Sequence, residues 1–313
     1  YDASGNCLGL LVEEARTNVV TYSEDFSQSY WLKQSVTVAP TSVAAPDGTT
    51  SAYEMDMASN GMVRALTGYV PSVGQSYTAS IWLKAGTAST VKLAILFNGS
   101  GLGMVTENLT LTNKWQRFDI TSTVPSGTPD QVRYRIVASE AGSILVWGAQ
   151  LEQGSFPTSY IPTSGSAVTR APDVASLAVS EFGYNQDQGT VVVSANAPDG
   201  SNQNRLTQLV TNGGSSNRVV DLHRVINSIS MYNGTSTLTV DAFGASNDIK
   251  AAGGYKSGSY ALVSDGGSPV TSSDTTVYTP DTLIIGANGS SARQLNGHIK
   301  SIQYYPLRLS NAQ

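Results

Sequence analysis

The sequence predicts an all-β protein made of two antiparallel β-sandwiches. Short apolar segments alternate inward and outward residues, as half-buried strands do, and turn-forming residues separate them at intervals of about 8–12 positions. Helical periodicity is nearly absent. Charged residues make up only 13% of the 313 positions, against roughly 25% in an average soluble domain. This neutral composition suits short strands joined by many turns.

The first half opens with residues 9–20, whose apolar spacing fits either one short helical turn or a strand followed by a loop. Spaced valines then indicate a strand before the turn at residues 46–48. Residues 77–84 alternate strictly, and residues 91–97 form a nearly continuous apolar strand that we expect to be buried on both faces. Further strands are expected at residues 115–120, 131–138 and 144–150.

The second half repeats this pattern with a different sequence. Its strands are expected at residues 189–195, 206–211, 218–223, 228–232, 237–242, 260–264, 282–285 and 298–305. Glycine-containing turns separate them. Asn233 and Gly234 lie between two apolar segments, a pattern typical of a two-residue hairpin loop.

Residues 144–170 mark the boundary between the halves, because a final strand there runs into a proline-punctuated linker. We expect a first domain at residues 1–162 that includes an N-terminal leading segment. The linker covers residues 163–173, and the second domain covers residues 174–313. A length of 313 residues favours about two domains, each long enough to bury its own core.

Charge and hydropathy exclude several function classes. The net charge is −5 and no Lys/Arg block is present, so we expect no nucleic-acid binding. No segment approaches the roughly 18 apolar residues of a membrane span, and no signal peptide opens the chain, so that Tyr1 reads as the start of a trimmed fragment. The single cysteine, Cys7, cannot form an internal disulfide, which favours either folding in a reducing compartment or a stability that needs no disulfide.

Catalytic signatures are sparse, so we expect no catalytic residues and no enzymatic activity. His223 and His298 are the only histidines, and neither lies in a metal-ligand spacing. His223 alternates with Asp221, so the two can share a face as a general base and its orienting carboxylate. Glycoside hydrolysis needs two carboxylates across a cleft. The candidate pairs are Asp221 with Asp241 and Glu54 with Asp56, and we expect all of these acids to be solvated.

Metal binding is left open by the sequence. Calcium loops of the EF-hand type are absent. Irregular oxygen sites near Asp47, Asp199 or Asp265 are compatible with the sequence, so a structural calcium ion remains an alternative. We expect no cofactor.

Aromatic residues near turns are the better candidates for ligand binding, since sugars stack on aromatic rings while amides and carboxylates bond their hydroxyl groups. Trp82, Trp115 and Trp147 lie inside strand patterns and are expected in the core. The predicted glycan-binding residues are Trp31, Tyr69, Tyr232, Asn233, Tyr255, Asp265 and Asn288.

Several motifs of the first half resemble a module of bacteriophage tail-fibre and minor tail proteins. They are GLLVEEARTN at residues 9–18, YTASIWLKAG at 77–86, WGAQLEQG at 147–154 and AVTRAPDVA at 167–175. That module is similar to jelly-roll carbohydrate-binding modules. The last 19 residues, from Leu295 to Gln313, resemble the final strand of a concanavalin-A-like (laminin-G-like) sandwich.

The resemblance implies a jelly roll followed by a concanavalin-A-like sandwich. It further implies a non-enzymatic virion protein, a tail fibre or receptor-binding appendage that recognises host-surface glycan. Its implied partners are its own copies in a homotrimer, other virion proteins and host polysaccharide, and its implied location is a virion assembled in the bacterial cytoplasm. A passive scaffold or decoration protein that contacts only other virion proteins is one alternative. A polysaccharide depolymerase is the second.

The resemblance does not supply the binding residues. The family pattern beyond Tyr255 continues into an Asn-Gly turn, whereas this chain has Asp265-Gly266-Gly267. The residues of that loop therefore cannot be carried over from the family.

Overall fold

The structure is a computed structural model that describes residues 5–100, 103–196, 204–211, 217–225, 228–241, 247–290 and 293–311. Within these ranges the chain is nearly all β-strand, with one short 3-10 helix, η1 (Val179–Glu181). Each described ladder is antiparallel, which confirms the predicted all-β class. No helix in the described ranges has the length and apolar character that a membrane span requires.

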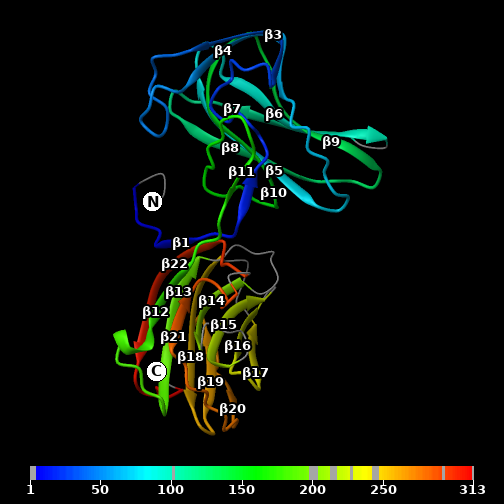
Figure 1. The fold of residues 1–313 in the computed structure, drawn as a ribbon. Coiled ribbons are helices and arrows are strands. Elements are labelled where there is room, and N and C mark those ends of the chain that lie inside the picture. The colour runs from blue at the N-terminus through cyan, green and yellow to red at the C-terminus, as the bar shows by residue number, and fades with distance from the viewer. Residues whose placement is uncertain are drawn as a thin grey trace. The chain divides into compact units, whose positions relative to one another are not determined.

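The chain forms two compact units, and their boundaries differ from the predicted ones. Residues Arg16–Arg170 form one unit, the inserted unit, while Tyr1–Ala15 joins Ala171–Gln313 in the other, the terminal unit. The reason is strand β1 (Leu10–Val12), which pairs with β22 (Gly297–Tyr305) near the opposite end of the chain (Figure 1). The sequence around β1 gives no sign of a partner so far along the chain, so the domain boundaries could not be predicted from it.

Short strands also occupy two segments that were predicted as leading segment and linker. Residues 9–20 contain β1 and then β2 (Arg16–Asn18), so the strand-and-loop alternative is correct and the helical turn is wrong. The predicted linker contains β11 (Val168–Arg170), which pairs with β2 so that Arg16 opposes Arg170. The inserted unit therefore begins and ends at one antiparallel pair.

The inserted unit contains an eight-stranded sheet with the order β7-β6-β9-β4-β10-β5-β8, and β3 pairs with β4 outside this path. Its strands are β3 (Trp31–Pro40), β4 (Tyr53–Ala65), β5 (Ser76–Ala85), β6 (Thr90–Ser100), β7 (Met104–Thr110), β8 (Gln116–Thr123), β9 (Thr128–Ala138) and β10 (Gly142–Gln153). Alternate side chains of β4, β5, β6, β9 and β10 pack into one apolar core. The sheet thus folds over on itself as a jelly-roll-like sandwich.

The long strand β4 connects the two layers of this sandwich. Its first part, Tyr53–Met57, pairs with β10, and residues 62–64 pair with β9. Between these parts the partner strand β3 bulges at Ser35, which adopts a φ of 52°. A Cβ atom on Gly61 would lie only 3.0 Å from the carbonyl oxygen of Ser35, so glycine permits this close approach.

Three of the four tryptophans form a separate small cluster. Trp147 and Trp82 oppose each other on β10 and β5, and Trp115 and Tyr160 pack with them around Ala45 and Ala52. Trp147 is buried, in agreement with the prediction, whereas Trp82 and Trp115 are only half-buried. All four tryptophans lie in the inserted unit, so tryptophan fluorescence reports on that unit alone.

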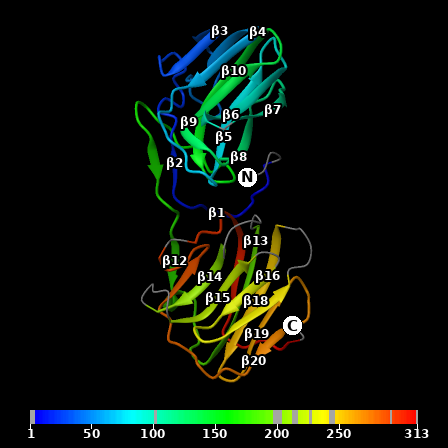
Figure 2. The same ribbon diagram turned by 90° about the vertical axis from the view of Figure 1, so that its right-hand side faces the viewer.

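The terminal unit is a sandwich of two six-stranded sheets, ordered β1-β22-β13-β18-β19-β20 and β12-β21-β14-β15-β16-β17 (Figure 2). Its other strands are β12 (Ala175–Ala178), β13 (Gln188–Asn196), β14 (Asn204–Val210), β15 (Arg218–Val225), β16 (Ser228–Tyr232), β17 (Thr237–Asp241), β18 (Asp248–Lys256), β19 (Tyr260–Ser264), β20 (Val270–Ser272) and β21 (Thr282–Ile285). Buried apolar residues of both sheets form one core.

Strand β18 shows how closely the two sheets pack. A Cβ atom on Gly253 would lie 2.7 Å from Met231 Sδ and 3.2 Å from Val220 Cγ1, so the small residue lets β15 and β16 approach. The sequence pattern missed this strand because its central residues are alanine and glycine, which lack the apolar alternation of the other strands.

The hairpin predicted at Asn233-Gly234 exists, but its loop has four residues instead of two. Tyr232 opposes Thr237, which leaves residues 233–236 as the loop. Asn233 accepts hydrogen bonds at Oδ1 from the backbone amides of Thr235 and Ser236, at 3.0 and 2.7 Å. These side-chain bonds add to a backbone hydrogen bond, which the amide of Asn233 donates to the carbonyl oxygen of Ser236 at 3.2 Å.

Val12 provides a test of the pairing between β1 and β22, which lie near opposite ends of the chain. Its side chain is 1% exposed in the core of the terminal unit. It packs so close to Gly286 that a Cβ atom on that glycine would lie 2.7 Å from Val12 Cγ2. We expect Val12→Ala to destabilise the terminal unit by about 1–3 kcal/mol. Urea unfolding followed by circular dichroism should show the shift, while the tryptophan-fluorescence transition stays in place. A shift of the fluorescence transition instead would contradict this assignment of β1.

Gly234 tests the geometry of the β16–β17 loop. Its φ is +92°, and a Cβ atom would lie 2.3 Å from Tyr278 Cε2. Gly258 is a matched control, because its φ is +74° but nothing lies within 4 Å of its Cβ position. We expect Gly234→Ala to lower the free energy of unfolding by about 1–3 kcal/mol more than Gly258→Ala, since only the first clashes. Equal losses in urea titrations would refute this packing.

Candidate functional site

The candidate site lies on the face of β14, β15 and β16 that points away from the core. Strand β15 turns Val220 and Leu222 inward, where both approach Gly253 of the facing sheet. The two-residue repeat therefore places Asp221 and His223 on the opposite face. There Asp221 opposes Tyr232 and His223 opposes Ser230. Cross-strand pairing thus gathers polar side chains on one surface.

A cavity of about 630 Å³ opens on this surface, a size within the range of roughly 300–1,000 Å³ that small-molecule sites occupy. Its lining is dominated by basic and amide side chains, namely Arg205, Arg218, His223, Asn288 and Arg293, together with Tyr232. Ser230 and Thr237 contribute hydroxyl groups. The lining is therefore rich in hydrogen-bond donors and poor in apolar surface. We call this cavity the polar pocket.

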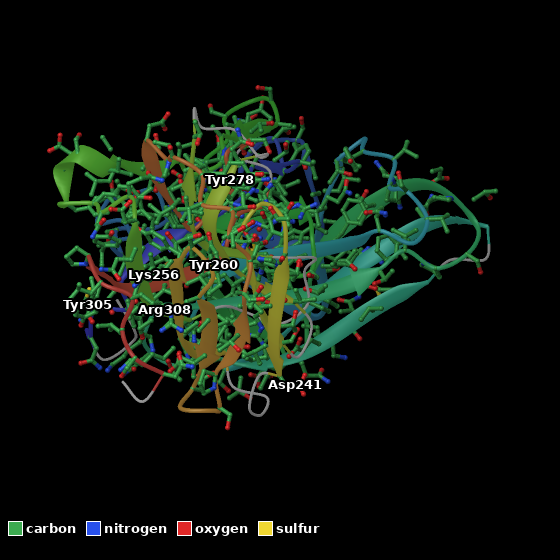
Figure 3. The ribbon with its side chains drawn as sticks, turned by 90° about the horizontal axis from the view of Figure 1, so that it is seen from below. Asp241, Lys256, Tyr260, Tyr278, Tyr305 and Arg308 are labelled. Carbon is green, nitrogen blue, oxygen red and sulfur yellow. The ribbon has the colours of Figure 1, made fainter. Side chains whose placement is uncertain are left out.

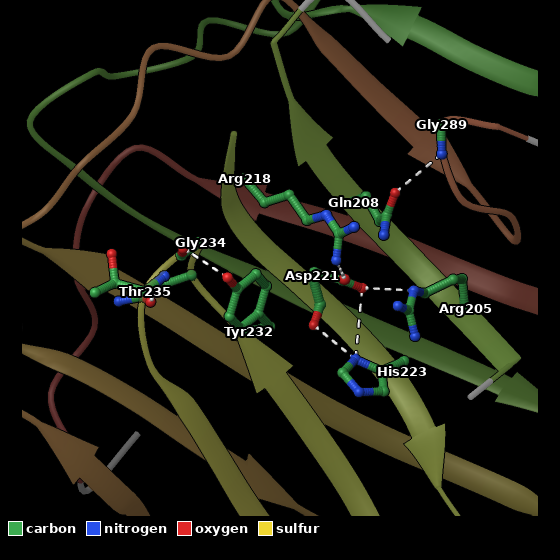
Figure 4. A network of polar contacts seen from close by, with 10 residues as sticks. Arg205, Gln208, Arg218, Asp221, His223, Tyr232, Gly234, Thr235 and Gly289 are labelled. Atoms are coloured by element: carbon green, nitrogen blue, oxygen red, sulfur yellow. Dashed lines mark hydrogen bonds and ion pairs between the residues drawn. The ribbon is translucent and has the colours of Figure 1, made fainter. Parts of the chain in front are cut away.

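Asp221 lies beneath the polar pocket and is fully buried (Figure 4). Arg218 Nη1 donates to Asp221 Oδ2 at 2.6 Å, and Arg205 Nε lies 3.1 Å from Oδ1. His223 Nδ1 lies 3.5 Å from the same Oδ1 atom. Figure 4 shows the three basic side chains arranged around the single carboxylate. Asp221 thus fixes the positions of three groups that line the pocket.

Electrostatics reflect this arrangement. Burial raises the pKa of Asp221, but the hydrogen bond from His223 and the charge of Arg205 outweigh it, so the pKa lies below the ordinary value. Burial lowers the pKa of Arg205 to about 10, where the attraction of Asp221 opposes the repulsion from Arg218 and Arg293. At neutral pH the guanidinium of Arg205 and the carboxylate of Asp221 are both charged.

Tyr232 and the loop after β21 complete the walls. The guanidinium of Arg218 lies 5.5 Å from the centre of the Tyr232 ring, a cation–π contact. The Tyr232 hydroxyl donates to the carbonyl oxygen of Gly234 at 2.6 Å. Gln208 Oε1 accepts from the backbone amide of Gly289 at 3.2 Å, next to Asn288. Both Tyr232 and Asn288 are thus presented by anchored segments.

Of the seven predicted glycan-binding residues, the structure brings only Tyr232 and Asn288 together in the polar pocket. Trp31 and Tyr255 are corrected to core residues, since both rings are essentially unexposed and cannot stack on a ligand. The indole of Trp31 donates to the carbonyl oxygen of Tyr22 at 2.9 Å. The Tyr255 hydroxyl meets that of Tyr304 at 2.8 Å, and burial raises its pKa far above the usual value.

The other three predicted residues have local structural roles. Asn233 is 2% exposed and closes the β16–β17 loop. Asp265 adopts a φ of 50° in the turn after β19 and accepts from the backbone amide of Lys250 at 2.8 Å. Tyr69 is half-buried in the inserted unit with its ring 5.9 Å from that of Tyr77.

The arginines of the polar pocket were missed by sequence reasoning. Arg205, Arg218 and Arg293 come from three separate segments, β14, β15 and the stretch before β22. Only Asp221 and His223 gave a local signal, through their alternation on one strand. That alternation does place both residues on one face, as predicted. There they belong to a cluster with Arg205 and Arg218 and do not form an isolated pair of a base and its orienting carboxylate.

Of the two carboxylate pairs considered for hydrolysis, Asp221 and Asp241 are too far apart, and Asp221 is buried instead of solvated as predicted. Asp221 opposes Tyr232, which opposes Thr237, whereas Asp241 lies four positions further along β17. At about 3.3 Å per residue and about 4.8 Å per strand, the two acids are well beyond the required separation of roughly 5–10 Å. Glu54 and Asp56 are exposed neighbours on one face of β4.

Metal ligands do not cluster within the described ranges, where no group of three or more His, Cys, Asp or Glu side chains is placed to hold an ion. Asp199, one of the acids considered for calcium, lies outside the described residues. Asp47 forms a local turn in which it accepts from Thr49.

A second concave region lies on the other sheet of the terminal unit. One cavity of about 570 Å³ is lined by residues that include Lys256, Tyr260 and Arg308 (Figure 3). The C-terminal segment shapes it, because Arg308 Nε donates to the carbonyl oxygen of Ser259 at 3.1 Å. The Tyr260 ring is buried. The lining of this cavity is also polar, but it contains two basic side chains, Lys256 and Arg308, against the three arginines and one histidine of the polar pocket.

Comparison with models of protein families and with curated proteins finds no match. Among solved structures, the chain is similar to the enzymatically active domain of bacteriophage CBA120 tailspike protein 4, with 15% identity and a TM-score of 0.36. The match covers 44% of this chain and only 21% of that one.

Two further similar structures span most of the chain. The tandem CBM22 domains of Paenibacillus barcinonensis Xyn10C show 9% identity and a TM-score of 0.35, covering 97% of this chain and 99% of that one. Mouse laminin α1 domains LG4-5 show 11% identity and a TM-score of 0.30, covering 98% and 94%. At these identities and TM-scores, the likenesses support no conclusion about function.

Asp221→Asn tests the network beneath the polar pocket. The substitution removes the one carboxylate shared by Arg205, Arg218 and His223. Leaving buried cations uncompensated costs about 3–5 kcal/mol, so we expect a loss of that size in urea unfolding followed by circular dichroism. As the control, Asp248→Asn removes an exposed partner of Lys300 and should leave the midpoint close to wild type.

The stability difference between wild type and Asp221→Asn should depend on pH. The pKa of Asp221 is lower in the folded protein than in the unfolded chain. Its stabilising contribution is therefore complete above the unfolded pKa of about 3.9 and is lost as the pH falls through the folded pKa. The difference in unfolding free energy between wild type and Asp221→Asn should be constant near neutral pH and shrink below about pH 4. A difference that grows on acidification would contradict the network.

Proposed function

We propose that this chain is a non-enzymatic glycan-binding protein and that the polar pocket of the terminal unit is its binding site. The observation that carries this proposal is a cavity of about 630 Å³ whose lining combines arginine, histidine, amide, hydroxyl and tyrosine side chains. Sugars present hydroxyl groups that both donate and accept hydrogen bonds. A lining of this kind matches them better than it matches an apolar ligand.

The rigidity of the pocket supports the same function. Arg205, Arg218 and His223 are held by contacts to Asp221 on paired strands, and Tyr232 is bonded to its own loop. Side chains that are ordered before binding lose little conformational entropy when a ligand arrives. A weakly binding ligand such as a sugar can then be held by a few well-placed groups.

We further propose that the chain is part of a bacteriophage tail fibre or receptor-binding appendage that recognises host-surface glycan. The sequence motifs at residues 9–18, 77–86 and 147–154 support this role through their resemblance to tail-fibre modules. Assembly as a homotrimer within a virion would bring several weak sites to one surface, and multivalency would raise the overall affinity.

The polar pocket favours binding over the two alternatives. A passive scaffold has no need of a cavity with converging basic and hydroxyl groups. A depolymerase needs a carboxylate that can exchange protons with substrate, whereas Asp221 is buried and held by three basic neighbours.

Tyr232→Ala tests the proposed site. We expect the full-length wild-type protein to bind members of a bacterial glycan array, and the variant to lose about tenfold or more in affinity for them by titration calorimetry. The loss follows from removal of a wall of the pocket and of the support under Arg218.

Tyr305→Ala is the matched control, because Tyr305 is 39% exposed and lines a different cavity of the terminal unit. It should bind like wild type. Loss of binding in the Tyr305 variant, with Tyr232→Ala unaffected, would place the site elsewhere. Absence of binding to every glycan tested would count against glycan recognition itself.

A further inference from the structure

The charges around the polar pocket carry information about its ligand. The chain as a whole has a net charge of −5, yet three arginines line this one cavity. No carboxylate belongs to the lining, as far as the described residues show. The pocket is therefore a local region of positive potential on an acidic protein.

Asp221 does not cancel this potential. Its two oxygens are already shared among Arg205, Arg218 and His223, at 2.6–3.5 Å. The carboxylate is fully buried beneath the pocket, so the basic groups lie between it and an incoming ligand. A ligand therefore meets the guanidinium groups first.

The basic groups repel one another. The pKa of Arg205 falls to about 10, because burial disfavours its charge and the charges of Arg218 and Arg293 act in the same direction against the attraction of Asp221. A second anion in the pocket would relieve this repulsion. Guanidinium groups form strong, directional hydrogen bonds to carboxylate, sulfate and phosphate oxygens, and they do so best when they are fixed in advance.

We propose that the glycan bound by the polar pocket carries an anionic substituent, a carboxylate or sulfate group, which Arg218 and Arg293 hold at the mouth of the pocket. Arg205 adds its charge from the wall, while Tyr232, Thr237 and Asn288 contact the uncharged part of the sugar. This inference rests on the proposed glycan-binding function and adds the chemical class of the ligand.

The test uses the full-length protein on an array that carries each acidic oligosaccharide beside its neutral counterpart. Uronic-acid oligosaccharides are paired with their carboxyl-reduced forms, and sulfated ones with their desulfated forms. We expect binding to acidic members and a loss of about tenfold or more on their neutral counterparts. The pair that shows the loss tells whether carboxylate or sulfate is the recognised group.

Arginine variants connect the charge preference to the pocket. Arg293→Gln changes an exposed residue and should lower affinity for the acidic ligand about tenfold, with little effect on a neutral one. Arg218→Gln should act in the same direction. Lys256→Gln makes the same change in net charge at a residue that lines a different cavity, so it should leave affinity unchanged.

The outcomes separate this inference from the function on which it rests. Equal binding to acidic and neutral counterparts overturns the inference and leaves glycan binding intact. An equal loss from Arg293→Gln and Lys256→Gln also overturns it, since the effect would then come from overall charge. Failure to bind any member of the array overturns both.

Discussion

The two-residue repeat of β15 is the constraint on which the terminal unit depends. Packing Val220 and Leu222 against the facing sheet forces Asp221 and His223 to the other surface. A slip of one residue would place the carboxylate in the apolar core, at a cost that no partner there could offset. One alternation therefore specifies both the core and the polar pocket.

Asp221 links stability to recognition. A buried carboxylate is costly unless cations surround it, and here the cations that surround it are the groups that line the cavity. The fold therefore orders these side chains before any ligand is present. One positive charge would neutralise Asp221, so the three arginines of the lining leave the pocket with an excess of positive charge on an acidic chain.

Many of the strands could be predicted from the local sequence, since strands rich in valine, leucine and isoleucine show alternating apolar and polar residues. Strand β18 was not predicted because its central residues are small. Gly253 allows close packing against Met231 and Val220, and small residues give no apolar alternation in the sequence. The β1–β22 pairing was not predicted, because a local sequence pattern does not indicate which distant strand is the partner.

The site was harder to read for related reasons. Tyr232 and Asn288 were found through their positions near turns, but the same criterion selected Tyr255, whose ring is in the core. Trp31 was selected because it lies outside the strand patterns of the other tryptophans, and its ring is also in the core. Burial of an aromatic ring depends on what packs over it, and that information is not local. The arginines converge only after three separate segments are brought together by the sheet.

The pairing of β2 with β11 has a consequence for how such chains evolve. Because Arg16 directly opposes Arg170, the Cα atoms where this unit enters and leaves the chain lie about 5.5 Å apart or less. A short hairpin loop can bridge such a gap, so the whole stretch from Arg16 to Arg170 is a cassette with adjacent ends. Exchange or deletion of that cassette by recombination would remove no strand from the flanking sandwich, because β1 and its partner β22 both lie outside it.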